Sequence, residues 1–215
     1  MRIVRLVFLA LFLAVPTLGQ ALVVGFGNST NGWPFSSSDF GPATRYQQVY
    51  DSAQFSGLFA INNLRFYVYD GSENRLPSGT FTLNFSTTTK AVDGLNTTDF
   101  DANVGSDQSL FTVKVLRGGN PQLLDFFGDE FVYDPTKGNL LLDIVTDITG
   151  RGGMQFLSTR NAGGVYSRAH NFGEGFDGMG LVTGFNEASV VEPGTFALVA
   201  LGLFAAIRTG RGRVI

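Results

Sequence analysis

Residues 80–85 read Thr80-Phe81-Thr82-Leu83-Asn84-Phe85, and residues 111–115 read Phe111-Thr112-Val113-Lys114-Val115. In both stretches apolar and polar side chains alternate with a period of two, which is the pattern of a β-strand with one buried and one exposed face. We therefore expect the phenylalanine, leucine and valine side chains of both stretches to face a core. The threonine, asparagine and lysine side chains should then face water.

Other stretches of the chain extend this pattern. Leu64–Tyr69 and Leu140–Val145 are apolar almost throughout and are expected to lie centrally in a sheet, the second after the turn Asp134-Pro135-Thr136-Lys137-Gly138. Weaker strand patterns occur at Ala43–Tyr50, Gln54–Ala60, Gly153–Ser158, Gly164–Ser167 and Gly180–Phe185. No helical segment among them is long enough for a parallel crossover. We predict an all-β fold, a two-sheet antiparallel β-sandwich with jelly-roll-like connections.

Composition and charge restrict the function. The chain has 28 glycines, 21 phenylalanines and no cysteine, so disulfide scaffolds, thiolate metal sites and cysteine nucleophiles are excluded. Residues 22–190 carry 10 basic and 17 acidic side chains, a net charge of −7. A negative domain lacks the basic face that sequence-independent nucleic-acid binding needs, so no nucleic-acid partner is expected.

The N-terminus has the pattern of a secretory signal. Arg2 and Arg5 precede the apolar segment Leu6–Val15, and Pro16 and a series of small residues follow it. This order is typical of a signal peptide, here residues 1–21, with cleavage after Gly19 or Ala21. We expect an exported ectodomain over residues 22–185, preceded by an N-terminal signal helix.

The C-terminus has the pattern of a short membrane anchor. After a tether at residues 186–191 come Val191-Glu192-Pro193-Gly194-Thr195, the apolar run Phe196–Ile207, and Arg208, Arg211 and Arg213. A helix over residues 195–207 is about 20 Å long, against a hydrocarbon core of about 30 Å. We expect this C-terminal apolar helix to anchor the chain weakly in the inner membrane, with the arginines on the cytoplasmic side.

These C-terminal residues resemble the PEP-CTERM sorting signal of Gram-negative bacteria that make extracellular polysaccharide. Glu192 and Pro193 match the motif, while Val191 stands where its first proline is usual. The resemblance implies that residues 191–215 are recognised by an exosortase, a membrane-embedded processing enzyme, and removed near the motif. It also implies a final location at the cell surface or outside the cell. The stretch from Phe131 to Ile144 resembles the uncharacterised β-sandwich ectodomains of that family.

Candidate chemistry within the ectodomain is limited to two places. His170 would act as a general base if Glu174 or Asp177 oriented it; the alternative is a loop or strand-edge histidine without a catalytic role. The other place is a loop with oxygen ligands at alternating positions, which suits calcium but departs from an EF-hand; the alternative is a polar hairpin connection. The calcium candidates are Asp99, Asp101, Asn103 and Asp107. No cofactor is predicted beyond this calcium candidate.

Aromatic residues near the start of the ectodomain admit two interpretations. Trp33, Phe35, Tyr46 and Tyr50 would stack on sugar rings if exposed, but we expect most of them in the core. Two function classes remain. The first is a non-catalytic surface or matrix protein associated with exopolysaccharide, with no enzymatic activity. The alternative is an extracellular polysaccharide hydrolase or lyase that uses ectodomain carboxylates.

Overall fold

The computed structural model describes residues 20–38, 41–42, 44–70, 75–171 and 178–187. Of these residues, 55% lie in strands and 4% in helical turns, which confirms the all-β prediction. The helical turns are two 3₁₀ helices, η1 (Ser52–Gln54) and η2 (Asp101–Asn103). The predicted signal helix and C-terminal apolar helix lie outside the described residues.

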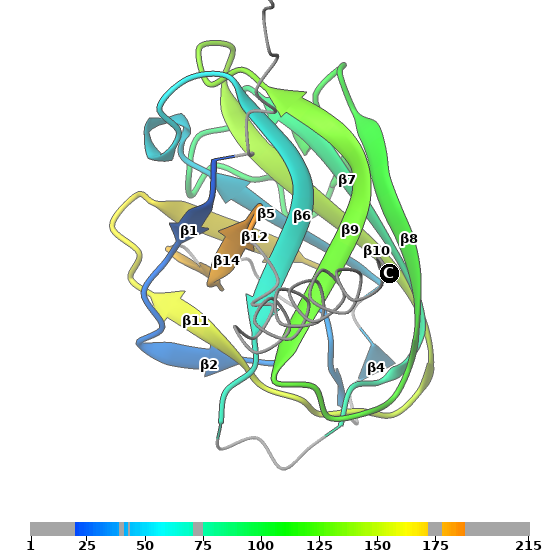
Figure 1. The fold of residues 1–215 in the computed structure, drawn as a ribbon. Coiled ribbons are helices and arrows are strands. Elements are labelled where there is room, and N and C mark those ends of the chain that lie inside the picture. The colour runs from blue at the N-terminus through cyan, green and yellow to red at the C-terminus, as the bar shows by residue number, and fades with distance from the viewer. Residues whose placement is uncertain (1–19, 39–40, 43, 71–74, 172–177, 188–215) are drawn as a thin grey trace, which may run out of the picture.

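The strands form antiparallel sheets (Figure 1). In chain order they are β1 (Leu22–Val24), β2 (Ser29–Asn31), β3 (Ser37–Ser38), β4 (Gly41–Pro42), β5 (Arg45–Tyr50), β6 (Phe59–Tyr67), β7 (Ser78–Thr88), β8 (Ser109–Arg117), β9 (Leu123–Tyr133), β10 (Asn139–Gly150), β11 (Phe156–Arg160), β12 (Tyr166–His170), β13 (Met179–Leu181) and β14 (Thr183–Phe185). The two larger sheets have the strand orders β1-β14-β6-β9 and β12-β5-β10-β7-β8, and we call them the four-stranded and the five-stranded sheet. Smaller sheets are β13-β11-β2 and β3-β4.

One phenylalanine joins the two larger sheets into a common core. The ring centroid of Phe35 lies 5.1 Å from that of Phe66 in β6 and 5.6 Å from that of Phe126 in β9, both in the four-stranded sheet. It also lies 5.4 Å from the Phe81 ring in β7 of the five-stranded sheet. Phe35 is fully buried, so its ring contributes both apolar burial and aromatic contacts. In the absence of disulfides, such packing stabilises the fold.

The two stretches with the clearest alternation pair with each other. They lie in β7 and β8, and Thr82 of β7 stands opposite Val113 of β8. Phe81, Leu83 and Phe85 are fully buried, as the alternation predicts.

The burial predicted for the stretch 111–115, which lies in β8, is wrong beyond Phe111. Phe111 is buried, but Val113 and Val115 are 54% and 55% exposed. The register shifts by a β-bulge at the position of Phe111, and a shift of one residue moves every later side chain to the opposite face. The inner face therefore receives Lys114, whose Nζ lies 5.0 Å from the centroid of the Phe126 ring. Burial lowers the pKa of Lys114.

Both continuously apolar stretches lie in central strands. Leu64–Tyr69 overlaps β6, between β14 and β9, and Leu140–Val145 lies within β10, between β5 and β7. The predicted turn before β10 closes with a hydrogen bond of 3.1 Å from the Lys137 amide to the Asp134 carbonyl.

The weaker strand patterns agree with the observed strands to different extents. Four of them overlap strands, namely β5, β11, β12 and the pair β13 and β14. Gln54–Ala60 is not a strand until Phe59, because η1 and a loop come first. The sequence pattern did not predict β9 as a strand, since its exposed face carries apolar side chains that obscure the alternation.

The predicted tether differs at its first residues. The Asn186 side chain accepts a hydrogen bond of 3.0 Å from the Asn62 amide and donates one of 2.6 Å to the Ala60 carbonyl. Glu187 accepts a hydrogen bond from the Tyr67 hydroxyl. These two residues are thus held against β6.

Candidate functional site

An exposed tyrosine lies just beyond the end of β6. Tyr69 is 43% exposed, although the sequence pattern placed it at the end of a central strand. Its backbone is fixed, because its amide donates a hydrogen bond of 2.9 Å to the Gln155 carbonyl and the preceding Val68 forms a β-bridge with Phe156. The ring is therefore presented to solvent from a rigid support.

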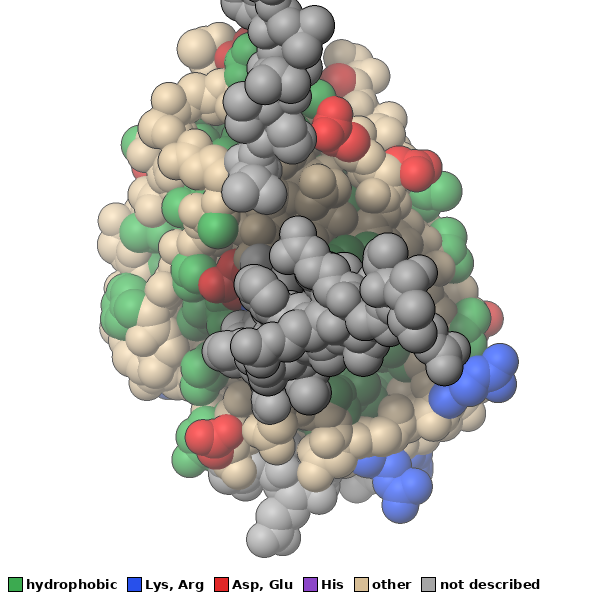
Figure 2. All heavy atoms as spheres, in the orientation of Figure 1, with side chains coloured by type: hydrophobic (Ala, Val, Ile, Leu, Met, Phe, Trp, Pro, Cys, Tyr) green, Lys and Arg blue, Asp and Glu red, His purple; other side chains and the backbone are tan. Residues whose placement is uncertain are grey.

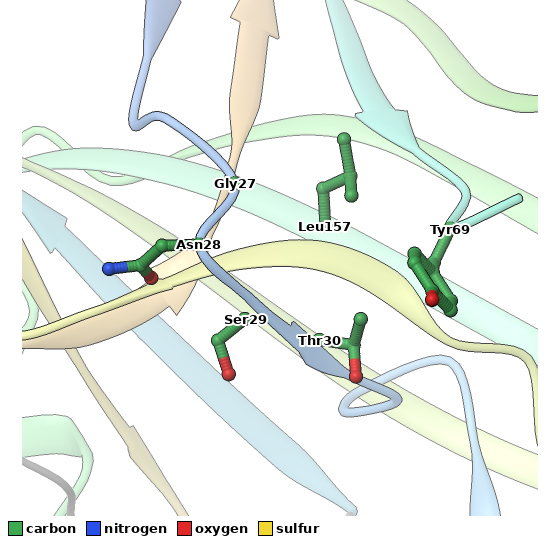
Figure 3. Close-up of a pocket in the computed structure, with 6 residues that line it drawn as sticks. All are labelled: Gly27, Asn28, Ser29, Thr30, Tyr69 and Leu157. Carbon is green, nitrogen blue, oxygen red and sulfur yellow. The ribbon is translucent and has the colours of Figure 1, made fainter. Parts of the chain in front are cut away.

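A hollow of about 340 Å³ lies on one side of this ring (Figure 3). It is lined by Gly27, Asn28, Ser29, Thr30, Tyr69 and Leu157, with Asn28 at one end and Tyr69 at the other in the view of Figure 3. β2 and β11 supply its floor, where Thr30 stands opposite Leu157.

At one end of this hollow, two hydrogen bonds fix the side chain of Asn28. Asn28 accepts a hydrogen bond of 2.8 Å from the Arg160 amide and donates one of 3.1 Å to the Arg160 carbonyl. Both functions of its amide thus bond to β11, which fixes the loop before β2.

A second hollow of about 410 Å³ lies next to the first and shares Tyr69 and Leu157 with it. The remaining lining residues are Tyr67, Val68, Asp70, Gln122 and Leu123. The Gln122 carbonyl accepts a hydrogen bond of 3.2 Å from the Val68 amide, which joins the two chain segments of this hollow. We refer to Tyr69, Leu157 and the two hollows as the Tyr69 surface.

The Tyr69 surface combines apolar and polar groups in the manner of a small-molecule site. Its hollows fall in the range of about 300–1,000 Å³ that is usual for ligand sites. The faces of Tyr69 and the side chain of Leu157 offer apolar contact, and Thr30, Gln122 and Asp70, all exposed, supply hydroxyl, amide and carboxylate groups at the rim. Such a surface suits a ligand with one apolar face and a hydroxylated edge.

The aromatic residues suggested by the sequence lie elsewhere. Phe35, Tyr46 and Tyr50 are fully buried, which confirms the core interpretation for these three. Trp33 is partly buried and its ring stacks on that of His170, with centroids 6.2 Å apart and an interplanar angle of 17°. The residue that sequence reasoning missed is Tyr69, which the continuous apolar pattern assigned to a buried strand.

His170, the only histidine, ends β12 and is 2% exposed. Burial, reinforced by the positive charge of Arg168, lowers its pKa to about 4. It is therefore neutral at pH 7. The position agrees with the strand-edge alternative, while the two carboxylates suggested as its partners, Glu174 and Asp177, lie outside the described residues.

The calcium candidates lie in the connection between β7 and β8, where each bonds to a different part of the chain. Asp99 accepts from the Ala102 amide at 3.3 Å, Asp101 pairs with Arg45 at 2.7 Å, Asn103 bonds to Gln47 and Asn96 at 2.8 and 2.7 Å, and Asp107 accepts from the Thr87 amide at 2.7 Å. Within the described part of the chain, no three histidine, aspartate or glutamate side chains gather where they could hold a metal ion. The calcium candidate and its alternative, a polar connection, both stay untested interpretations.

Close packing explains the glycine of this loop. A Cβ at Gly105 would lie 1.8 Å from the Thr87 carbonyl oxygen, so only glycine permits the approach. Asn103 and Asp107 also line a third hollow of about 540 Å³, together with Thr87–Thr89, Ser106 and Lys137. The loop is thus bonded to β5 and β7 through these side chains.

The processing residues cannot be placed. Gly19 and the sorting residues Val191, Glu192, Pro193, Arg208, Arg211 and Arg213 lie outside the described residues; Ala21, the other cleavage candidate, lies directly before β1. Across the described ranges, no helix has the length and apolar character needed to cross a membrane.

Comparison with protein-family models, with curated proteins and with solved structures gives no match to this chain.

Proposed function

We propose that this chain is an exported, non-catalytic surface or extracellular-matrix protein that binds polysaccharide at the Tyr69 surface. The observation that carries the proposal is a single exposed tyrosine, fixed at its backbone, between two adjoining hollows. A sugar ring has an apolar face of C–H groups and a hydroxylated edge, so it matches an aromatic face with hydroxyl and amide groups at the rim. Two adjoining hollows suit consecutive sugar units of a chain.

The export part of the proposal rests on the two ends of the sequence. The N-terminal signal pattern brings the domain out of the cytoplasm, and the PEP-CTERM-like tail gives it a transient anchor in the inner membrane. We propose that an exosortase-type enzyme then cuts near Glu192 and Pro193 and delivers the domain to the cell surface or the extracellular space. A bacterial surface rich in polysaccharide would supply the ligand.

The architecture that supports this function is proposed to be a jelly-roll-like β-sandwich. The four-stranded and five-stranded sheets share the Phe35 core, and a sandwich places loops and sheet ends where ligands are accessible. In this arrangement the segment after β6 and the strands β2 and β11 present the Tyr69 surface beside the main core.

Binding to immobilised exopolysaccharide of the host tests the proposal. We expect Tyr69→Ala to weaken binding about tenfold, since an aromatic contact and its buried area are lost, while Tyr69→Phe keeps most of the affinity. Val113→Ala is the matched control, because Val113 is also an exposed apolar residue but lies on β8. Equal binding by all variants would exclude this surface.

The same assay separates binding from hydrolysis or cleavage. Reducing-end release is measured in parallel on the unbound fraction. Retention without release supports a binding protein. Turnover that disappears with Asp70→Asn, the change of a carboxylate that lines the second hollow, would establish the enzymatic alternative.

A further inference from the structure

The strands β6 and β9 have an outer face that points away from the core. In β6 the side chains of Leu64 and Phe66 are fully buried in the core, so the alternating residues Asn63, Arg65 and Tyr67 belong to the opposite face. In β9 the residues opposite these three are Phe127, Asp125 and Leu123. We call these six residues and Val132, which stands opposite Ala60, the outer β6–β9 face.

This face combines exposed apolar and acidic side chains. Leu123, Phe127 and Val132 are 42%, 61% and 56% exposed. Asp129 and Glu130, both exposed, follow Phe127 in the same strand. Figure 2 views the molecule from the side of β6 and β9, and the hydrophobic and acidic side chains on this side are interspersed, while the visible basic side chains gather at the lower right. Several large apolar side chains exposed on one face often mark a contact surface.

A buried amide on the same face has no partner. Asn63 is 3% exposed, yet neither its Oδ1 nor its Nδ2 makes a hydrogen bond. Leaving a buried amide unbonded costs about 1–3 kcal/mol, so such a group is normally satisfied by whatever completes its surroundings. Two neighbouring polar residues on this face are bonded: Arg65 forms a two-point ion pair with Asp125 at 2.6 and 2.9 Å. Asn63 is thus a polar group of this face that the domain itself leaves unbonded.

The chain leaves the described domain from this face. Glu187, the last described residue, accepts a hydrogen bond from the Tyr67 hydroxyl, and its carboxylate lies 3.6 Å from Nη1 of Arg65. The apolar run begins nine residues later, at Phe196. Nine extended residues reach about 30 Å, so the run has ample length to return to β9.

We propose that, in the unprocessed chain, residues 196–213 dock on the outer β6–β9 face of their own domain. The apolar run covers Leu123, Phe127 and Val132, and Arg208, Arg211 and Arg213 lie near Asp129 and Glu130, whose charge is opposite. The inference depends on the apolar and basic composition of the tail and not on sugar binding or on processing.

The physical advantage is protection of the tail of an unprocessed chain whenever no bilayer holds it. An apolar run of twelve residues exposed to water favours aggregation, whereas docking removes apolar surface on both partners from water. Docking within one chain needs no association of separate molecules, so modest contacts suffice. A bilayer then competes with the domain for the same apolar residues.

Cysteine cross-linking of the full chain tests this docking directly, because the natural chain has no cysteine. One variant carries Phe127→Cys and Leu203→Cys. The matched control carries Val145→Cys and Leu203→Cys, since Val145 is exposed on β10 in the other large sheet. Both are treated with a short bismaleimide in detergent-free buffer, and the monomer fraction is analysed by mass spectrometry. Circular dichroism of each variant establishes that it is folded.

We expect at least five times more intrachain cross-link in the Phe127 variant than in the control. Changing Asp129 to Asn and Glu130 to Gln should lower that yield at least twofold, and 1 M salt should do the same by screening the charges. Equal yields in the two variants would overturn the proposal. Cross-links found only between two chains would also overturn it and would assign the face to a second copy. Loss of the intrachain cross-link only when vesicles are added would support the proposal, because the membrane is expected to compete for the tail. Glycan binding and tail removal are scored separately, so their failure leaves this outcome unaffected.

Discussion

Arg45 and Asp143 form a two-point ion pair on the outer face of the five-stranded sheet. Nε and Nη2 of Arg45 donate to the two carboxylate oxygens of Asp143 at 3.0 and 2.8 Å, and this hydrogen bonding raises the pKa of Arg45. Nη1 of the same arginine donates to Asp101 at 2.7 Å. One guanidinium thus connects β5 and β10 with the loop that carries the calcium candidates.

The two carboxylates should contribute unequally to stability. Asp143 is 2% exposed and Arg45 retains some solvent access, so we expect Asp143→Ala to lower the free energy of unfolding by about 2–3 kcal/mol. The Asp101 side chain is 86% exposed, and Asp101→Ala should cost less than about 1 kcal/mol. Urea denaturation of the two variants measures the difference. Equal losses would mean that the buried pair contributes no more to stability than the exposed loop contact.

Calcium should have little effect on the melting temperature. The oxygens of Asp101 and Asp107 already accept hydrogen bonds from Arg45 and from the Thr87 amide, so a calcium ion would have to displace these donors. We expect millimolar calcium to shift the melting temperature by less than about 1 °C relative to a chelator. A rise of several degrees that Asp101→Ala removes would instead establish the site that the sequence suggests.

Acid should destabilise the domain through His170. Its pKa is about 4 in the folded protein and 6.5 as the ordinary value, so below pH 6.5 the unfolded chain takes up a proton that the folded chain does not. This contribution to stability is complete above pH 6.5 and is lost as the pH falls toward 4. Between pH 6.5 and 5 we expect a loss of roughly 1 kcal/mol per pH unit, which His170→Gln should remove.

The measurement compares urea unfolding of the natural chain and the glutamine variant at pH 7, 6 and 5. The difference between the two proteins isolates the histidine, because they differ only at residue 170. Parallel curves for the two proteins would show that His170 is protonated in the folded state. Trp33, which stacks on His170, provides fluorescence for the titration.

The sequence predicts the fold class because apolar and polar side chains alternate with a period of two within individual strands. Phe81, Leu83 and Phe85 are buried as the alternation requires, and β7 pairs with β8. The face of β8 could not be predicted, since the bulge depends on how two strands meet and has no signal within either one.

The candidate site was largely hidden from sequence reasoning. Tyr69 lies two residues beyond the last residue of β6 and is exposed there. The ends of strands are the boundaries that a sequence pattern predicts least accurately, so the pattern included Tyr69 in the strand. Its partners Thr30, Gln122 and Leu157 come from distant parts of the chain. Composition did favour aromatic contacts with sugar, but it could not say which ring reaches the surface.

Removal of the tail is the prediction on which the proposed destination depends. Residues 195–207 would form a helix about 10 Å shorter than the hydrocarbon core, and the arginines after it oppose translocation. Glu192 and Pro193 would then lie just outside the membrane, where a processing enzyme would have access. We expect the mature protein of the native host to lack residues 196–215.

Mass spectrometry of the native surface fraction identifies the C-terminal peptide. Pro193→Ala, or replacement of Arg208, Arg211 and Arg213 by neutral residues, should leave an unprocessed chain in the inner-membrane fraction. Val113→Ala serves as the control, because it changes an exposed residue of the domain and leaves the signal intact. Each C-terminal change lies outside residues 20–187, so the β-sheet signal in circular dichroism should be the same for all variants. A surface-located protein that still ends at Ile215 would identify residues 195–207 as a simple tail anchor, and the exosortase proposal would then be wrong.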